Sequence, residues 1–187
     1  MKNFCHFGRK KSNALFLLLI MISSIYSWDY LLGGLDWEET CLEKGESPID
    51  IAGPFTSAPA NLEFFYNNIP GTYKLQNDGN NLFLEGDFGY IKYNGIIYTS
   101  TQIYFYSPSQ HTFMNKRYPL EVQVMHTNAD GTTKIAISIM HKTDPTQFST
   151  LLEKIGFAEE SLRKMEPFKS QIINQQININ KYLTSTK

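Results

Sequence analysis

A run of short alternating segments between residues 62 and 140 constrains the fold of this chain more than any other feature. Segments such as LEFFY, NLFLEG and LEVQVMH are rich in apolar and aromatic residues, and turn signals such as NDGN and TNADG separate them. Short strands with close turns between them are typical of hairpins. The pattern predicts one large, twisted, mostly antiparallel sheet. A chain of 187 residues is too short to add a second sizeable core.

The segments after residue 140 follow a different pattern. TQFSTLLEKIG and AEESLRKM have helical spacing, with Asp-Pro before the first and a glycine at its end. These features predict helices near residues 146–156 and 158–165. The last stretch, QIINQQININKYLTSTK, is polar and alternates only weakly. We expect it to be extended and poorly held, and we expect residues 28–59, which are rich in turn residues, to be irregular.

The first 27 residues have the pattern of a secretory signal. A basic start, MKNFCHFGRKK, precedes the short apolar run ALFLLLIMI and the small residues of SSIYS. The alternative is a transmembrane anchor, but the apolar run is shorter than the roughly 20 residues that cross a bilayer. We therefore expect a signal peptide at 1–27, a single domain at 28–187 with no membrane span, and a location outside the cell or in the secretory-pathway lumen.

Charge and cysteine content narrow the possible partners of the mature domain. Four of the 17 Lys and Arg residues precede residue 28, so 13 remain against 18 Asp and Glu. A mildly acidic domain without a basic aromatic run gives no indication of nucleic-acid binding. Cys41 is the one cysteine left after Cys5 is removed. In an oxidising compartment it is expected either to form an intermolecular disulfide or to remain a buried free thiol.

Three ordered blocks of sequence resemble the α-class carbonic anhydrases of the secreted type. They are WDY…GGLDWEETC…KGESPIDI, LEFFYNNIPGTYKLQNDGNNLFLEG and QIYFYSPSQHT…KRYPLEVQVMHTN. The resemblance implies a large, mostly antiparallel sheet in a mainly β (α+β) fold. It also implies a chain that stops before the C-terminal third of that domain, where the family carries a substrate-orienting threonine and the cysteine that pairs with the counterpart of Cys41.

The resemblance also assigns the positions of the metal ligands. In the family, two histidines at i and i+2 of one strand and a third on the neighbouring strand bind zinc, which activates a water. Those positions fall on Tyr104, Tyr106 and Gln123. A phenol with a pKa near 10 and a neutral amide are poor zinc ligands. The sequence therefore predicts no zinc and no catalytic residue at these positions.

Residues around the predicted site are partly retained. By the resemblance, Glu121 matches the acidic residue that orients the third histidine, and His111 matches a buried histidine near the site. Gln110 replaces a glutamate that accepts a hydrogen bond from the active-site threonine, and Asn80 replaces the proton-shuttle histidine. We expect His111, Glu121 and also His126 to serve a satisfied polar network under the sheet, because buried polar groups must find partners.

These observations favour a catalytically inactive carbonic-anhydrase-related protein, that is, a pseudoenzyme acting as an extracellular binding or structural module. A protein partner or a second copy of the chain is the expected partner. The alternatives are a zinc-dependent enzyme that hydrates carbon dioxide, which the fold alone would suggest, and a truncated gene fragment of such an enzyme.

Overall fold

The computed structural model describes residues 47–54, 61–67, 70–142, 150–155 and 169–183. The chain divides into two compact units, Met1–Ile49 and Asp50–Lys187, and every strand and helix named below belongs to the second. The predicted signal segment, Cys41 and the helix expected at 158–165 lie outside the described residues, so these remain predictions.

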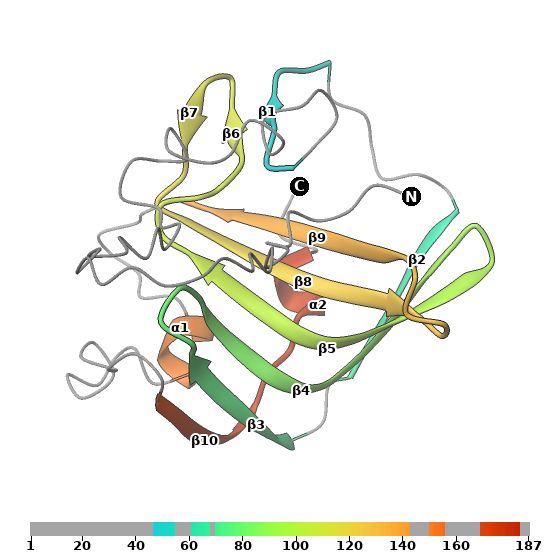
Figure 1. The fold of residues 1–187 in the computed structure, drawn as a ribbon, viewed down its shortest axis with the longest axis vertical. Coiled ribbons are helices and arrows are strands. Elements are labelled where there is room, and N and C mark those ends of the chain that lie inside the picture. Colours follow the sequence, from blue (N-terminus) through green and yellow to red (C-terminus); the bar gives the residue numbers. More distant parts are fainter. Residues whose placement is uncertain (1–46, 55–60, 68–69, 143–149, 156–168, 184–187) are drawn as a thin grey trace, which may run out of the picture. The chain divides into compact units, whose positions relative to one another are not determined.

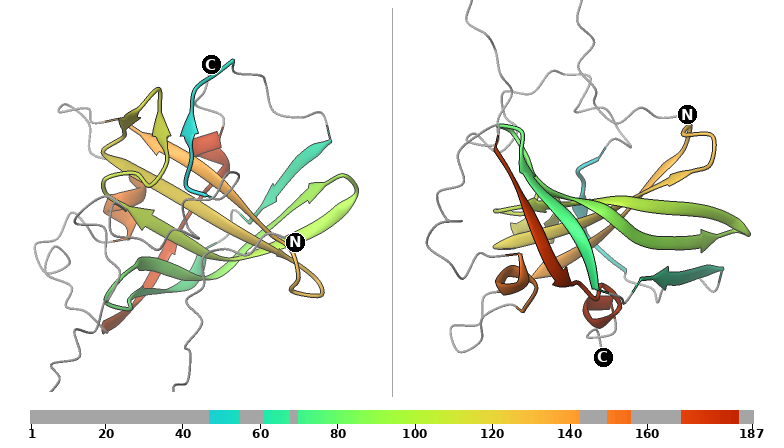
Figure 2. Two further views of the ribbon diagram at one scale, coloured as in Figure 1. Left: turned by 45° about the horizontal axis from the view of Figure 1, so that its top comes forward. Right: turned by 90° about the horizontal axis from the view of Figure 1, so that it is seen from below.

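A twisted seven-stranded sheet is the main element of the fold (Figures 1 and 2). Its strands run in the order β10, β3, β4, β5, β8, β9, and β2 also pairs with β4. Each neighbouring pair is antiparallel, which confirms the predicted sheet. The strands are β2 (Leu62–Tyr66), β3 (Pro70–Asn77), β4 (Leu82–Tyr93), β5 (Ile96–Tyr106), β8 (Leu120–Asn128), β9 (Lys134–His141) and β10 (Lys169–Gln176).

The long β4–β5 hairpin forms the centre of this sheet. Its two-residue turn, Asn94-Gly95, has positive φ at both residues, as the tight turns that match strand twist require. Register shifts between Glu85 and Gly89 in β4, and between Ser100 and Gln102 in β5, interrupt the pairing. Such bulges bend a strand and increase its twist.

One face of the sheet carries the hydrophobic core. Leu84, Ile103 and Val124 pair across β4, β5 and β8 and are almost fully buried. Helix α1 (Thr150–Lys154) contributes Leu151 to this cluster, which confirms part of the helix predicted at 146–156. Both α1 and α2 (Asn180–Leu183) lie on this side of the sheet (Figure 2). Among the described residues no helix is long and apolar enough to span a membrane.

The C-terminal stretch corrects one expectation. It is extended, as predicted, but it is well held, because β10 pairs with β3 along its whole length. Ile173, Ile177 and Ile179 are buried in the core, and the described part of the stretch includes the short helix α2. The sequence spacing concealed this because the apolar residues are separated by amides. The pairing partner lies far away in the chain, so tertiary packing decides the structure here.

A second, three-stranded sheet links distant segments. It consists of β1 (Asp50–Ile51), β6 (Thr112–Phe113) and β7 (Lys116–Arg117), and β1 runs parallel to β6. The Asp50 carboxylate accepts hydrogen bonds from the Thr112 hydroxyl at 2.7 Å and from the Asn115 backbone N–H at 2.8 Å. This contact fixes the β6–β7 hairpin next to the loop that leads into the site described below.

Candidate functional site

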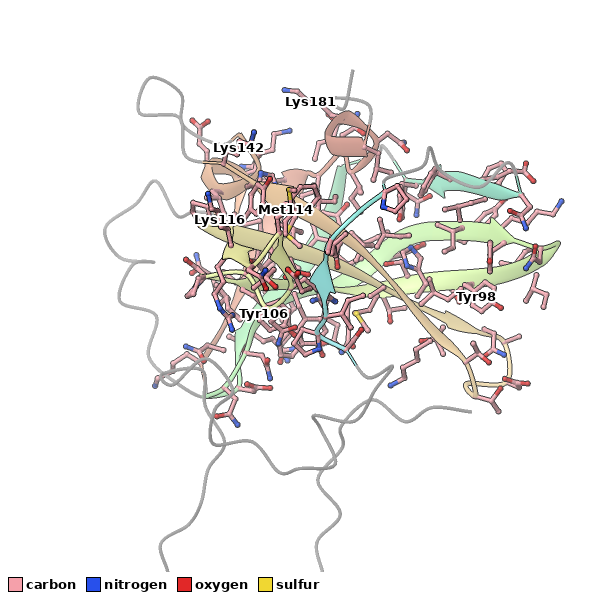
Figure 3. All side chains as sticks on the ribbon, turned by 90° about the horizontal axis from the view of Figure 1, so that it is seen from above. Tyr98, Tyr106, Met114, Lys116, Lys142 and Lys181 are labelled. Carbon is pink, nitrogen blue, oxygen red and sulfur yellow. The ribbon has the colours of Figure 1, made fainter. Side chains whose placement is uncertain are left out.

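The structure brings Tyr104, Tyr106 and Gln123 together on the face of the sheet opposite the core. Tyr104 of β5 pairs directly with Gln123 of β8, and Tyr106 pairs with Glu121. Side chains alternate along a strand, and Phe105 between the two tyrosines belongs to the core, so both tyrosines point to the other face. In Figure 3, Tyr106 lies on the side of the sheet away from the helix that carries Lys181.

An aromatic stack occupies this face. The rings of Phe83 and Tyr104 are stacked with centroids 5.0 Å apart, and those of Tyr104 and Tyr106 are nearly parallel at 6.2 Å. The Tyr104 hydroxyl donates a hydrogen bond to Oε1 of Gln102 at 3.3 Å. The tyrosines are therefore held by neighbouring rings and an amide, which are contacts that require no metal.

The electrostatic environment keeps Tyr104 neutral. Burial raises the pKa of its phenol above the ordinary value, and the negative charges of Asp78 and Glu85 raise it further. Asp78 lies in the β3–β4 turn together with Asn80, whose side chain is exposed and whose backbone N–H donates to the Asp78 carboxylate at 2.9 Å. The position expected to correspond to a proton shuttle thus holds an amide that has no proton to exchange near neutral pH.

A buried carboxylate network lies next to the tyrosines. The side chain of Glu121 is fully buried and accepts four hydrogen bonds. Its Oε2 accepts from the backbone N–H groups of Gln110 at 2.9 Å and His111 at 3.0 Å. Its Oε1 accepts from His111 Nδ1 at 2.7 Å and from Gln123 Nε2 at 2.8 Å. A carboxylate offers about four lone-pair sites, so this one is saturated.

The same hydrogen bonds fix the ionisation of Glu121. Burial by itself raises the pKa of this carboxyl, but the hydrogen bonds from His111 and Gln123 outweigh burial and hold the pKa below its usual range. Because Nδ1 of His111 donates, its ring carries the proton on Nδ1. Gln123 Nε2 also donates to Oε1 of Gln110 at 3.0 Å, which uses both hydrogens of that amide group.

His126 is satisfied by hydrogen bonds, as expected, but it does not belong to the same network as His111 and Glu121. This residue lies on the core face, whereas His111 and Glu121 lie on the opposite one. Its Nδ1–H donates to the Ile135 carbonyl at 3.2 Å, and its Nε2 accepts from the Tyr66 hydroxyl at 3.0 Å. Burial lowers the pKa of His126 to about 4. His126 is therefore a neutral residue of the core.

A row of four residues on neighbouring strands accommodates this contact. Tyr66, Gly89, Ser100 and His126 pair in sequence across β2, β4, β5 and β8. The Tyr66 side chain must therefore cross Gly89 and Ser100 to reach His126. Gly89 has φ +95°, and a Cβ there would lie 2.3 Å from the Phe65 carbonyl oxygen. The buried Ser100 hydroxyl has no hydrogen-bond partner among the described residues.

Sequence reasoning missed two participants, Phe83 and Gln102. Both face the site because β4 and β5 pair through Phe83 and Tyr104, and because Gln102 precedes Tyr104 by two positions. The partner of Tyr104 in β4 can be found by counting residue pairs outward from the Asn94-Gly95 turn. That count reaches Phe83 only if the bulges between the turn and Tyr104 are included. The glycines of EGDFGY were the available signal, since glycine within a strand often marks a bulge.

Comparison with known proteins identifies the family. The sequence matches the family described as eukaryotic-type carbonic anhydrase over residues 32–186. The chain therefore belongs to the α-class, or eukaryotic-type, carbonic anhydrase family.

Several relatives and solved structures show how far the similarity extends. Alpha carbonic anhydrase 2 of Arabidopsis thaliana is 30% identical over 140 residues, covering 68% of this chain and 57% of that protein. Dioscorin dioA3 of Dioscorea japonica is 25% identical over 148 residues, covering 76% and 49%. The chain thus spans roughly half the length of the curated relatives it matches.

Solved structures confirm the fold. The Photobacterium profundum α-carbonic anhydrase superposes with a TM-score of 0.65 at 21% identity, covering 86% of this chain and 73% of that chain. A hyperthermostable carbonic anhydrase from a hydrothermal vent chimney gives 0.65 at 24% identity, covering 86% and 72%. At these identities the likeness establishes the architecture, and the chemistry must be argued from the residues of this chain.

Proposed function

We propose that this chain is a catalytically inactive carbonic-anhydrase-related protein that acts outside the cell as a binding or structural module. The observation that supports the proposal is the set of side chains at Tyr104, Tyr106 and Gln123, the positions that the sequence resemblance assigns to the zinc ligands. The extracellular location depends on the predicted signal segment at residues 1–27.

The residues present do not fit a zinc ion. Zinc sites in proteins use imidazole, thiolate or carboxylate ligands. Here two phenols are available, the pKa of Tyr104 is raised, and Gln123 offers an amide whose N–H groups already donate to Glu121 and Gln110. Among the described residues no group of three His, Cys, Asp or Glu side chains could hold a metal. No hydration step is therefore assigned to this site.

The hydrogen bonds of Glu121 are a second observation that supports this proposal. In a carboxylate–histidine–zinc arrangement, the carboxylate accepts a hydrogen bond from the ligand imidazole. Glu121 accepts its corresponding bond from the Gln123 amide at 2.8 Å. Both oxygens of Glu121 thus remain paired without a metal-bound imidazole.

The decisive experiment measures zinc content and carbon dioxide hydration on the same purified chain. After dialysis against dilute zinc, we expect far less than one zinc per chain and a hydration rate equal to that of buffer. A variant carrying Tyr104→His, Tyr106→His and Gln123→His is the matched control, and it should retain zinc because the three positions share one face.

Either of two results would overturn the proposal. About one zinc per unmodified chain after dialysis would show that other ligands form a site. A hydration rate clearly above buffer would favour the alternative, a zinc-dependent enzyme, to which the family membership points. If the triple variant also failed to hold zinc, the assignment of the three positions as former ligands would be wrong.

A further inference from the structure

The turn between β4 and β5 contains Asn94-Gly95, the one Asn-Gly dipeptide of the chain. Both residues have positive φ, 51° for Asn94 and 81° for Gly95, as a tight two-residue hairpin turn requires. Both are exposed, and no described atom lies within 4 Å of the position that a Cβ of Gly95 would take. Apart from its neighbours in the chain, no described residue therefore crowds Gly95.

The hydrogen bonds of this turn leave the Gly95 N–H unused. The Asn94 N–H donates to the Asn61 carbonyl at 3.2 Å, one residue beyond the Leu62↔Tyr93 pair of β2 and β4. The side-chain N–H of Asn61 donates to Oδ1 of Asn94. Gly95 makes no backbone hydrogen bond to a described residue. The turn thus places an unbound backbone N–H directly after a side-chain amide whose oxygen is held by a donor.

This arrangement suits attack of a backbone nitrogen on a side-chain amide. Hydroxide removes the proton of the Gly95 N–H, and the nitrogen forms a bond to Cγ of Asn94. The Cγ–Nδ2 bond then breaks, and Nδ2 takes up a proton from water and leaves as ammonia, which closes a succinimide ring. Water opens this ring at either carbonyl and gives isoaspartate or aspartate at position 94.

Asn61 is placed to assist the first step. A donor aimed at an oxygen on which negative charge develops lowers the barrier of a reaction, and Oδ1 of Asn94 becomes such an oxygen when Cγ is attacked. We propose that Asn94 is a self-modification site that converts to isoaspartate and aspartate, with Asn61 as the assisting donor. This reaction goes beyond the proposed function and requires neither a partner surface nor a bound ligand.

Isoaspartate would alter the sheet next to the turn. Its main chain runs through the former side-chain carbonyl, so the turn gains a methylene group and a free carboxylate. A two-residue turn fixes the register of the strands that it joins, here through the Tyr93↔Ile96 pair at its base. The isoaspartate form should therefore have a lower midpoint of thermal unfolding than the unmodified chain.

The test is a peptide map of the folded full chain after storage at mildly alkaline pH. The peptide that contains Asn94 should gain the mass difference between an amide and a carboxyl and separate into two products. Asn128, in the β8–β9 turn, is the internal control and should react later. Alanine follows it, its Oδ1 accepts from the Thr133 N–H at 2.9 Å, and its Nδ2 donates to the Thr132 hydroxyl at 3.3 Å.

The variant Asn61→Ala tests the assisting donor. In the folded chain it should slow the conversion of Asn94 about two- to tenfold, the range that one neutral hydrogen bond provides. In urea the chain is unfolded and Asn61 no longer lies opposite Asn94, so the same substitution should then have no effect. Urea unfolding of both chains before storage shows that the variant is folded.

Three results would refute the proposal. One is an Asn94 that converts in urea but not in the folded chain, because the turn would then protect the dipeptide. Another is conversion that is as fast at mildly acidic as at mildly alkaline pH, since removal of the Gly95 proton would not be involved. The third is faster conversion in folded Asn61→Ala, which would mean that Asn61 holds the amide away from the attacking nitrogen.

Discussion

The hydrogen bond between Gln123 and Glu121 allows a quantitative prediction of how much the side chain of Gln123 contributes to stability. Gln123→Leu preserves the size of a side chain that is 5% exposed, but removes its donations to Glu121 and Gln110. A hydrogen bond to a charged acceptor contributes about 1.5–3 kcal/mol and a neutral one about 0.5–1.5 kcal/mol. The free energy of unfolding should therefore fall by about 2–4.5 kcal/mol.

The matched variant is Gln123→His. An imidazole N–H can still donate to Glu121, so this variant should lose only the bond to Gln110 and be destabilised by about 1 kcal/mol. Urea unfolding at pH 7 measures both variants, and an unchanged dependence on denaturant would show that the same surface is exposed. The midpoint of thermal unfolding should be lowest for Gln123→Leu, higher for Gln123→His and highest for the unmodified chain.

Equal stability of the Gln123→Leu and Gln123→His variants would mean that the backbone and His111 donors satisfy Glu121 by themselves. A Gln123→Leu variant more stable than the unmodified chain would mean that the buried network costs more than apolar packing in its place. Either result would contradict a stabilising role for the Gln123–Glu121 hydrogen bond.

Two further predictions concern the core face of the sheet. Below the ordinary histidine pKa of 6.5 the unfolded chain binds a proton that folded His126, with its pKa near 4, does not. Stability contributed by His126 is therefore present above pH 6.5 and lost as the pH falls to about 4, by about 3 kcal/mol, and unfolding of His126→Leu across this range should lack that slope. Gly89→Ala should cost more than about 3 kcal/mol, because the new Cβ would lie 2.3 Å from the Phe65 carbonyl oxygen. Gly95→Ala, with φ +81° but open space around it, should cost about 1 kcal/mol, and equal losses in thermal unfolding would contradict this steric account.

The sequence predicts the sheet well where pairing is local. The β4–β5 hairpin follows from alternation on both sides of Asn94-Gly95, and the face shared by Tyr104 and Tyr106 follows from their i, i+2 spacing. To predict that Tyr104 pairs with Gln123, the register between β5 and β8 had to be known. The resemblance supplied that register through the matching segments SPSQHT and KRYPLE.

Long-range contacts could not be derived in this way. The partner of Ile173 in β3 is Tyr73, and nothing in the polar stretch around Ile173 specifies that partner. The bulges beside Gly89 and Ser100 likewise depend on how the sheet twists around its core. His126 was grouped with His111 and Glu121 in one polar network because a buried histidine and a buried glutamate lie near each other in the sequence. The alternation of β8 separates them.

The row Tyr66, Gly89, Ser100 and His126 makes four strands depend on one another at a single level of the sheet. A larger side chain at Ser100 or Gly89 would obstruct the tyrosine, and a shorter one at Tyr66 would leave the imidazole acceptor unmatched. These four positions are separated along the chain but cannot change independently. Over evolutionary time they are expected to covary as a set, with a change at one tolerated only when the others have already shifted to accommodate it.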